Sequence, residues 1–149
     1  MSDDQIFTKN RVILSHFDTY STALVFARFG KTLLVPGALP AGAGVASAPP
    51  TIERVYPGDA VLQATIARYS LNPAEVFREA QFDAWLVAAG DLVRIHLLRF
   101  KTFRPPADVI EPHGGVFKSI SELRGAAPVE LDLVRGVFNL IMGGDQKRG

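Results

Sequence analysis

LVRIHLLRFKTF, residues 92–103, is the stretch that decides the fold class of this chain. Its apolar residues at first fall at every second position, with Arg94 and His96 between them. This two-residue period predicts a strand with one buried and one solvated face. The adjacent Leu97 and Leu98 then shift the phase, as a bulge or a twist would. Because helical patterns lie on both sides of this strand, the sequence predicts a mixed fold.

Two helices are expected directly before the strand, over residues 59–70 and 73–89, and they would form an αα-hairpin. The second helix has the clearer signals, because Asn72 suits its N-cap, Pro73 its first position and Gly90 a left-handed stop. One face of this helix would be apolar. The opposite face would carry an acidic stripe made of Glu75, Glu79 and Asp83.

The N-terminal part of the chain has the composition of strands. RVILSHF, residues 11–17, predicts a strand, and residues 22–35 predict a hairpin that turns at Gly30 and Lys31. A single amphipathic helix over residues 11–29 is the alternative, because apolar residues there also recur at helical spacing.

Residues 36–50, PGALPAGAGVASAPP, are rich in proline, glycine and alanine and carry no charge. Such a segment can neither continue a helix nor bury much side-chain surface, so it predicts a flexible loop. The loop is longer than most connections in compact domains. We therefore expect a lid over a site, an arm on a neighbouring subunit or a disordered surface segment, and the sequence leaves these three open.

An apolar helix is expected near the C-terminus, over residues 128–142. A proline opens it, acidic residues occupy its first turn, and Gly143 and Gly144 would end it. A short polar tail would then occupy residues 143–149.

The apolar residues of this last helix cover most of its circumference, whereas a helix on the surface of a monomer needs only one apolar stripe. A second copy of the chain would cover the additional face through a two-fold pairing. The sequence therefore predicts a homodimer with Leu133 and Leu140 at the interface, and with the loop at 36–50 as the next contact.

The bulk composition narrows the class of protein. The 149 residues are 48% hydrophobic and 21% charged, with a net charge of +1 and no cysteine, which excludes a disordered chain, a disulfide framework and thiolate chemistry. No window reaches the ~18 apolar residues of a membrane helix, and no signal peptide is evident, so a soluble cytoplasmic protein is expected. The elements together predict one α+β domain over residues 1–149. Its small, mostly antiparallel sheet would be packed by the αα-hairpin and the C-terminal helix.

Basic residues are concentrated in the strand that decides the fold. Residues 92–107 carry four bases and no acid, and the candidate ligand-binding residues are Arg94, His96, Arg99 and Lys101. A small anionic ligand suits this set. Phe100 and Phe103, interleaved with these bases, leave single-stranded nucleic acid as an alternative, although no RNA-binding signature is present. Nucleic acid is not expected, because a helix-turn-helix built from residues 59–89 would present its acidic stripe to the phosphates. The alternative is that these charges only solvate the exposed face of a strand.

IEPHGGVF, residues 110–117, contains the remaining candidates. Glu111 and His113 have the chemistry of a proton-transfer pair, and Asp108 with His96 could join them around a divalent ion. The spacing matches no metal or phosphate motif, so no metal site is predicted and no cofactor is indicated. The alternative is an ordinary turn whose glycines supply positive φ.

Two functions from different classes follow from these candidates. The first is a small binding or interaction module, homodimeric and without catalysis of its own. The second is a small enzyme or small-molecule-binding domain that holds an anionic ligand between the basic strand 92–103 and the loop 105–117. In that case His113 and Glu111 would be catalytic. Whether catalysis occurs at all is left open by the sequence.

Overall fold

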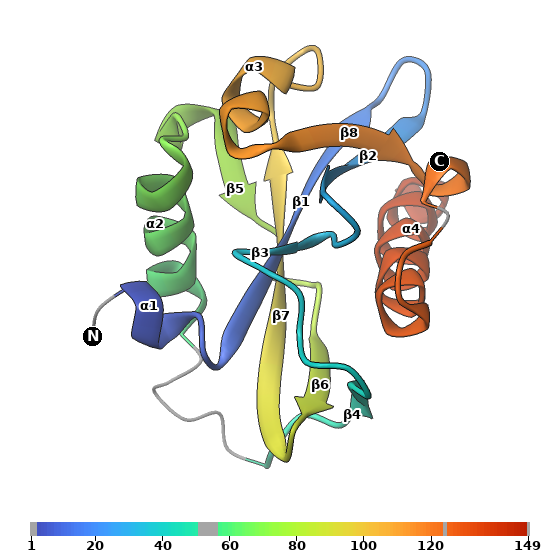
Figure 1. Ribbon diagram of the computed structural model, residues 1–149. Helices are drawn as coiled ribbons and strands as arrows, with labels where there is room; N and C mark the ends of the chain where they lie inside the picture. The colour runs from blue at the N-terminus through green and yellow to red at the C-terminus, as the bar shows by residue number, and fades with distance from the viewer. Residues whose placement is uncertain (1–2, 51–56, 124, 149) are drawn as a thin grey trace.

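The computed structural model describes residues 3–50, 57–123 and 125–148. Within them, eight strands form one open sheet with helices on both faces (Figure 1). The main elements in chain order are α1 (Asp3–Ile6), β1 (Asn10–Asp18), β2 (Ala23–Phe29), β3 (Leu34–Val35), β4 (Gly44–Ala46), α2 (Gly58–Tyr69), β5 (Val76–Arg78), β6 (Ala84–Ala88), β7 (Asp91–Phe100), α3 (Ala107–Ile110), β8 (Gly115–Ser119) and α4 (Pro128–Arg148). Short 3-10 turns are η1 (Pro73–Glu75), η2 (Glu111–His113) and η3 (Ile120–Glu122).

The strand order is β4-β6-β7-β1-β2-β8, and β3 and β5 pair with β1 and β7 beside this path. The predicted mixed α+β class is confirmed. The expected mostly antiparallel arrangement is corrected to a mixed sheet, because the central strands β1 and β7 are parallel, from Asn10 opposite Arg94 to His16 opposite Phe100. Parallel strands need a long crossover, and the chain between β1 and β7, which includes α2, provides one.

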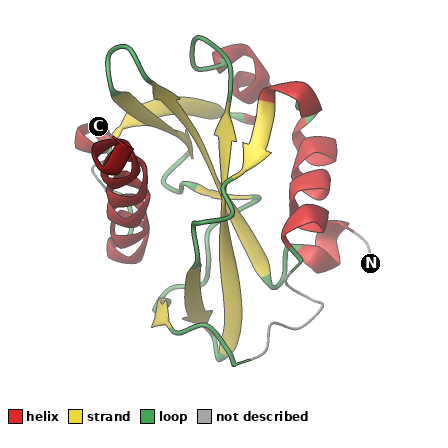
Figure 2. Cartoon of the chain, turned by 180° about the vertical axis from the view of Figure 1, so that it is seen from behind, coloured by secondary structure: helices red, strands yellow, loops and turns green. Residues whose placement is uncertain are grey.

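The strand β7 is buried on both faces rather than on one. Val93, Ile95 and Leu97 belong to the core that also contains residues of α4, whereas Leu98 and Phe100 belong to the core that contains residues of α2. Figure 2 shows these helices on opposite sides of the sheet. The pairing with β1 continues without interruption past Leu97 and Leu98, so the two leucines mark no bulge. They face two different cores, as in an interior strand of a sheet that is covered on both sides.

The helix expected over residues 59–70 is confirmed as α2, but the helix expected over residues 73–89 is wrong, and no αα-hairpin or helix-turn-helix forms. The signals at Asn72 and Pro73 are used only locally. The Asn72 side chain accepts a hydrogen bond of 3.0 Å from the amide of Ala74, and the 3-10 turn η1 ends at Glu75. The chain then becomes extended in β5 and again in β6.

Residues 76–88 are extended because the edge of β7 that does not pair with β1 needs other strands as partners. The strands β5 and β6 both pair antiparallel with β7 and satisfy backbone groups that would otherwise be buried without partners. Gly90, taken as a helix stop, instead forms the turn between β6 and β7 with a φ of 85°, next to Ala89 with a φ of 51°. A helix end and a tight hairpin both use a residue of positive φ, so this signal is ambiguous.

The strand expected over residues 11–17 is confirmed as β1, and the helical alternative over 11–29 is wrong. The predicted turn at Gly30 and Lys31 is present, closed by two hydrogen bonds between Phe29 and Thr32. After the turn the chain does not pair back along β2. It forms β3, which pairs with the part of β1 that β2 leaves uncovered.

Two C-terminal and loop expectations also change. Within the segment 36–50, residues 44–46 form β4, the edge strand that pairs with β6, so part of this segment belongs to the sheet. The helix α4 continues to Arg148, so Gly143 and Gly144 do not end it. Within the described residues, no helix has the length and apolar character needed to cross a membrane.

The apolar residues of α4 pack on the sheet of their own chain. Leu133 is 7% exposed and lies in one core with Val134, Val137 and Ile141, and Leu140 is half-buried against that core. The apolar surface that the sequence assigned to a partner is therefore largely covered by the same chain, because a helix that lies flat on a sheet buries more than one narrow stripe. Phe138, which is 40% exposed, is the large apolar side chain on the outer face.

One buried carboxylate fixes α4 to the sheet. Glu130, 4% exposed, accepts hydrogen bonds from the Leu33 amide at 2.7 Å and from Oγ1 of Thr32 at 2.9 Å. Replacing Glu130 by alanine leaves the buried Leu33 amide without its acceptor, so we expect the free energy of unfolding to fall by about 2–3 kcal/mol. Urea denaturation measures this change. Glu130→Gln keeps one oxygen acceptor and should lose less; equal losses in the two variants would contradict the assignment.

Candidate functional site

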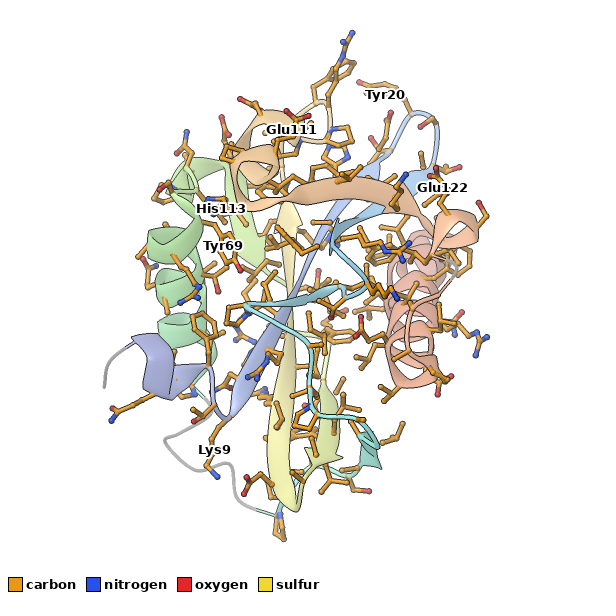
Figure 3. All side chains as sticks on the ribbon, in the orientation of Figure 1. Lys9, Tyr20, Tyr69, Glu111, His113 and Glu122 are labelled. Carbon is orange, nitrogen blue, oxygen red and sulfur yellow. The ribbon has the colours of Figure 1, made fainter. Side chains whose placement is uncertain are left out.

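The candidate residues of the basic strand do not all lie at the same end of the sheet as Glu111 and His113. Glu111 and His113 lie near α3, whereas Lys9 lies at the far end (Figure 3). The amide of Arg94 donates a hydrogen bond of 3.0 Å to the Lys9 carbonyl oxygen, which places Arg94 at that far end as well. Arg94 therefore does not converge with Glu111 and His113 on one ligand.

Glu111 and His113 occupy the 3-10 turn η2, and both are exposed. The His113 ring packs edge-on against Tyr69 of α2, with 4.8 Å between the ring centroids. Gly114 follows with a φ of 83°, which is the positive-φ turn that the sequence offered as the alternative. Within the part of the chain that is described, no three histidine, aspartate or glutamate side chains gather as ligands for a metal ion. A proton-transfer role for Glu111 and His113 stays a prediction.

The bases of β7 are neutralised by the acids that the sequence assigned to a helical stripe. Arg99 forms an ion pair of 2.9 Å with Glu79, and a nitrogen of Arg94 lies 4.0 Å from Asp83. Both guanidinium groups also lie over aromatic rings, Arg94 at 5.3 Å from the centroid of Trp85. Burial lowers the pKa of Arg94, and Asp83 opposes that shift. Glu79 and Asp83 lie in the connection between β5 and β6, and because both strands pair with the same edge of β7, this connection brings the two acids close to the two arginines.

His96 lies in the interior and not on a ligand surface. It is 1% exposed, and its Nε2 lies 2.7 Å from Oδ1 of Asn10. The Asn10 amide nitrogen donates to the carbonyl oxygen of Ile6, so its oxygen is the acceptor and Nε2 of His96 carries the proton. Burial, followed by the charges of Arg94 and Arg78, lowers the His96 pKa to about 3. A neutral, covered ring cannot attract an anion by charge.

A largely apolar hollow lies between the sheet and α4, and we call it the α4 cleft. It has a volume of about 450 Å³. Its walls come from β4, from the turn before β6 and β6 itself, and from α4. The residues that line it are Val45, Ala46, Ala48, Gln81, Phe82, Asp83, Ala84, Trp85, Leu86, Asp132, Leu133, Gly136 and Leu140.

The polar groups of the α4 cleft are few and acidic. Asp83 and Asp132 are its titratable residues, and Gln81 adds an amide. The Trp85 indole N–H donates to Oδ1 of Asp83 at 2.7 Å, and the same oxygen faces Arg94. Within the described chain Oδ2 of Asp83 has no hydrogen-bond partner. One carboxylate oxygen is thus held in place while the other can accept a hydrogen bond.

Two further hollows lie outside the α4 cleft. One, of about 590 Å³, is lined by residues 38–43 and by the start of α4, so the middle of the loop at 36–50 runs along its own chain. Another, of about 310 Å³, lies at the other end of β7 and contains Arg99 and Lys101. Two of the four candidate ligand-binding residues therefore share one hollow.

Sequence reasoning missed the α4 cleft because its walls are brought together by the fold. The one local signal was Gly136, a glycine inside an apolar helical pattern, where alanine would be more stable by about 1 kcal/mol. Phe82 and Leu133 carry no sign of a site in the sequence. No model of a known protein family matches this chain, and a search among curated proteins finds no match.

Proposed function

We propose that the protein is a small binding module, without catalysis of its own, that takes a compact apolar ligand carrying a positive or hydrogen-bond-donating group in the α4 cleft. The observation that carries this proposal is the combination of apolar walls with two carboxylates in one cleft of about 450 Å³. This volume falls within the range of roughly 300–1,000 Å³ that is typical of small-molecule sites.

The residues that line the cleft support binding rather than reaction. In the described chain no histidine, serine, threonine or lysine lines it, so a nucleophile with an adjacent base is missing there. Asp132 is paired with Arg135 at 3.0 Å, but both side chains are more than half exposed. Such surface pairs contribute about 0–1 kcal/mol, so Asp132 can exchange Arg135 for a ligand at little cost.

Gly136 keeps the middle of the cleft open. A Cβ atom at this position would lie 3.9 Å from Cε1 of Phe82, an ordinary contact, so alanine fits without displacing its neighbour. A longer side chain would extend into the space that the ligand needs. Glycine has a lower helical propensity than alanine and so lowers the stability of α4, but it leaves the space in the cleft open.

The experiment uses a matched pair of probes, 1-naphthylmethylamine as an apolar cation and 1-naphthoate as an anion of similar shape. Trp85 is the only tryptophan and belongs to a strand that lines the cleft, so its fluorescence reports binding of the amine. We expect Gly136→Leu to weaken amine binding at least about tenfold, because it removes roughly 1.4 kcal/mol or more of contact. The melting temperature should remain within a few degrees.

Gly136→Ala is the control. It should keep amine binding and raise the free energy of unfolding by about 0.5–1 kcal/mol through helical propensity alone. Unchanged affinity of the amine for the leucine variant, or an amine that binds no better than uncharged 1-naphthalenemethanol, would remove the proposal.

The predicted homodimer and the predicted cytoplasmic location stay predictions. A dimer through α4 would have to use its outer face, where Phe138 lies beside Arg135 and Asn139 in a shallow apolar hollow with Ile120 and Ser121. Such an interface would differ from the one predicted from the sequence, because Leu133 lies in the core of its own chain.

A further inference from the structure

The end of the sheet beyond the α4 cleft carries a pocket of different chemistry, which we call the aromatic–basic pocket. It is formed where β1 and β7 end, beside β5, and has a volume of about 310 Å³. Among the residues that line it are Asp18, Tyr20, Phe77, Arg99, Lys101 and Phe103. Figure 3 shows Tyr20 at the tip of the turn after β1, far from Lys9.

Two aromatic rings stand in solvent at the mouth of this pocket. Tyr20 is 87% exposed and Phe103 is 75% exposed, yet the two come from separate loops and meet with their ring centroids 6.3 Å apart. Their planes are tilted by 59°, and most of the surface of both residues is exposed. A planar ring placed against them would bury apolar surface that the fold itself leaves in water.

The pocket contains two basic residues, Arg99 and Lys101, which differ in whether they already have a charged partner. Arg99 is fixed by its ion pair with Glu79 and lies 5.4 Å over the Phe77 ring. Lys101 is exposed, and among the described residues no carboxylate pairs with its ammonium group. Lys101 is therefore the group that can take up an anion without giving up another partner.

The one acid in the pocket is already engaged. Oδ1 of Asp18 accepts hydrogen bonds from the amides of Tyr20 at 2.8 Å and Ser21 at 3.4 Å. These hydrogen bonds, the one from Tyr20 first, lower the Asp18 pKa, so the carboxylate is part of the turn that presents Tyr20. The charged residues that line the pocket are Arg99, Lys101 and Asp18, and because Arg99 is paired with Glu79, Lys101 is the cation that a ligand can use.

We propose that the aromatic–basic pocket binds a planar aromatic anion, with its ring against Tyr20 and Phe103 and its carboxylate or phosphate at the Lys101 ammonium. This site is independent of the α4 cleft, which offers carboxylates and suits the opposite charge. A small ring fits a hollow of about 310 Å³ with one available cation. A nucleic acid strand would need several cations in succession to track its phosphates, so it is not the ligand that we infer.

The test is a titration with 1-naphthoate, followed by saturation-transfer NMR, on the full chain and on single variants. We expect Phe103→Ala to raise the Kd at least about fivefold, the loss typical of one aromatic stacking contact. Lys101→Met should raise it by about three- to tenfold through loss of one charged contact, and Lys101→Arg should restore binding. Lys118→Met is the matched control, because Lys118 lies on β8 beside Glu122 and should leave the Kd unchanged.

Gly136→Leu, which closes the α4 cleft, should also leave 1-naphthoate binding unchanged, so the two proposals fail separately. Equal effects of Lys101→Met and Lys118→Met would overturn the inference, because binding would then follow overall charge. Loss of 1-naphthoate binding in Gly136→Leu would overturn it as well. The inference is also overturned by a ten-nucleotide oligothymidylate that binds more tightly than 1-naphthoate and depends on Phe103.

Discussion

Replacing Leu133 by glutamate is expected to unfold the protein rather than to separate two protomers. Leu133 is 7% exposed and packs in the core that joins α4 to the sheet. A carboxylate placed there has no cationic partner in that core, and the cost of burying it is several kcal/mol. With a typical net stability of roughly 5–15 kcal/mol, we expect a loss of about 3–5 kcal/mol. Thermal denaturation followed by circular dichroism measures the loss.

Phe138→Glu is the matched control on the outer face of the same helix. Phe138 is 40% exposed, so its replacement should change the melting temperature by only a few degrees. If the chain is a homodimer through α4, this variant should halve the mass measured by light scattering. A mass of one chain for the unmodified protein at high concentration would contradict the predicted dimer.

The second large effect is a loss of stability in acid that depends on His96. The folded-state pKa of His96 is about 3, below the ordinary value of 6.5, because the ring is buried near Arg94 and Arg78. The unfolded chain therefore takes up a proton as the pH falls below 6.5, while the folded chain does not. The stability that rests on the neutral ring is fully present above pH 6.5 and is lost as the pH falls toward 3.

The expected size is about 1.4 kcal/mol per pH unit within this window, and about 4–5 kcal/mol if the chain stays folded across all of it. Urea denaturation at half-unit steps between pH 7 and pH 4 measures the slope. Carboxylates add slopes of their own, so the comparison is with His96→Gln, whose curve should be flatter by the stated amount. A His96→Gln curve parallel to that of the unmodified protein would contradict the assignment.

Several parts of the fold follow from local patterns. The strand at 11–17, the strand at 92–103, the helix at 59–70 and the start of the last helix near 128 all lie where the sequence predicts them. In each case the local preference and the tertiary environment agree. Asn72 and Pro73 also have the roles expected at the start of a helix, because Asn72 is the N-cap and Pro73 the first residue of the 3-10 turn η1. That turn simply ends after three residues.

Residues 76–88 show where local patterns fail. Their apolar residues fit a helical face and also fit two short strands, and only the open edge of β7 decides between them. The pairing of β1 with β7, which buries His96 and pairs Asn10 with Arg94, joins residues far apart in the chain. No local window contains that information. The sequence therefore predicts a half-buried strand at 92–103, whereas the structure shows an interior strand that is buried on both faces.

The candidate sites divide in the same way. The sequence by itself determined which residues have charge, aromatic rings or titratable groups, and it determined that Arg99 and Lys101 are close together because they share a strand end. Only the tertiary structure decided that Arg94 lies far from Glu111 and His113, that Tyr20 meets Phe103, and that α4 leaves a cleft beside β6. The physical reason is that a site is a set of distances across the fold. Those distances follow from strand order and helix packing, which are set by burial and backbone pairing over the whole chain and not by any one segment.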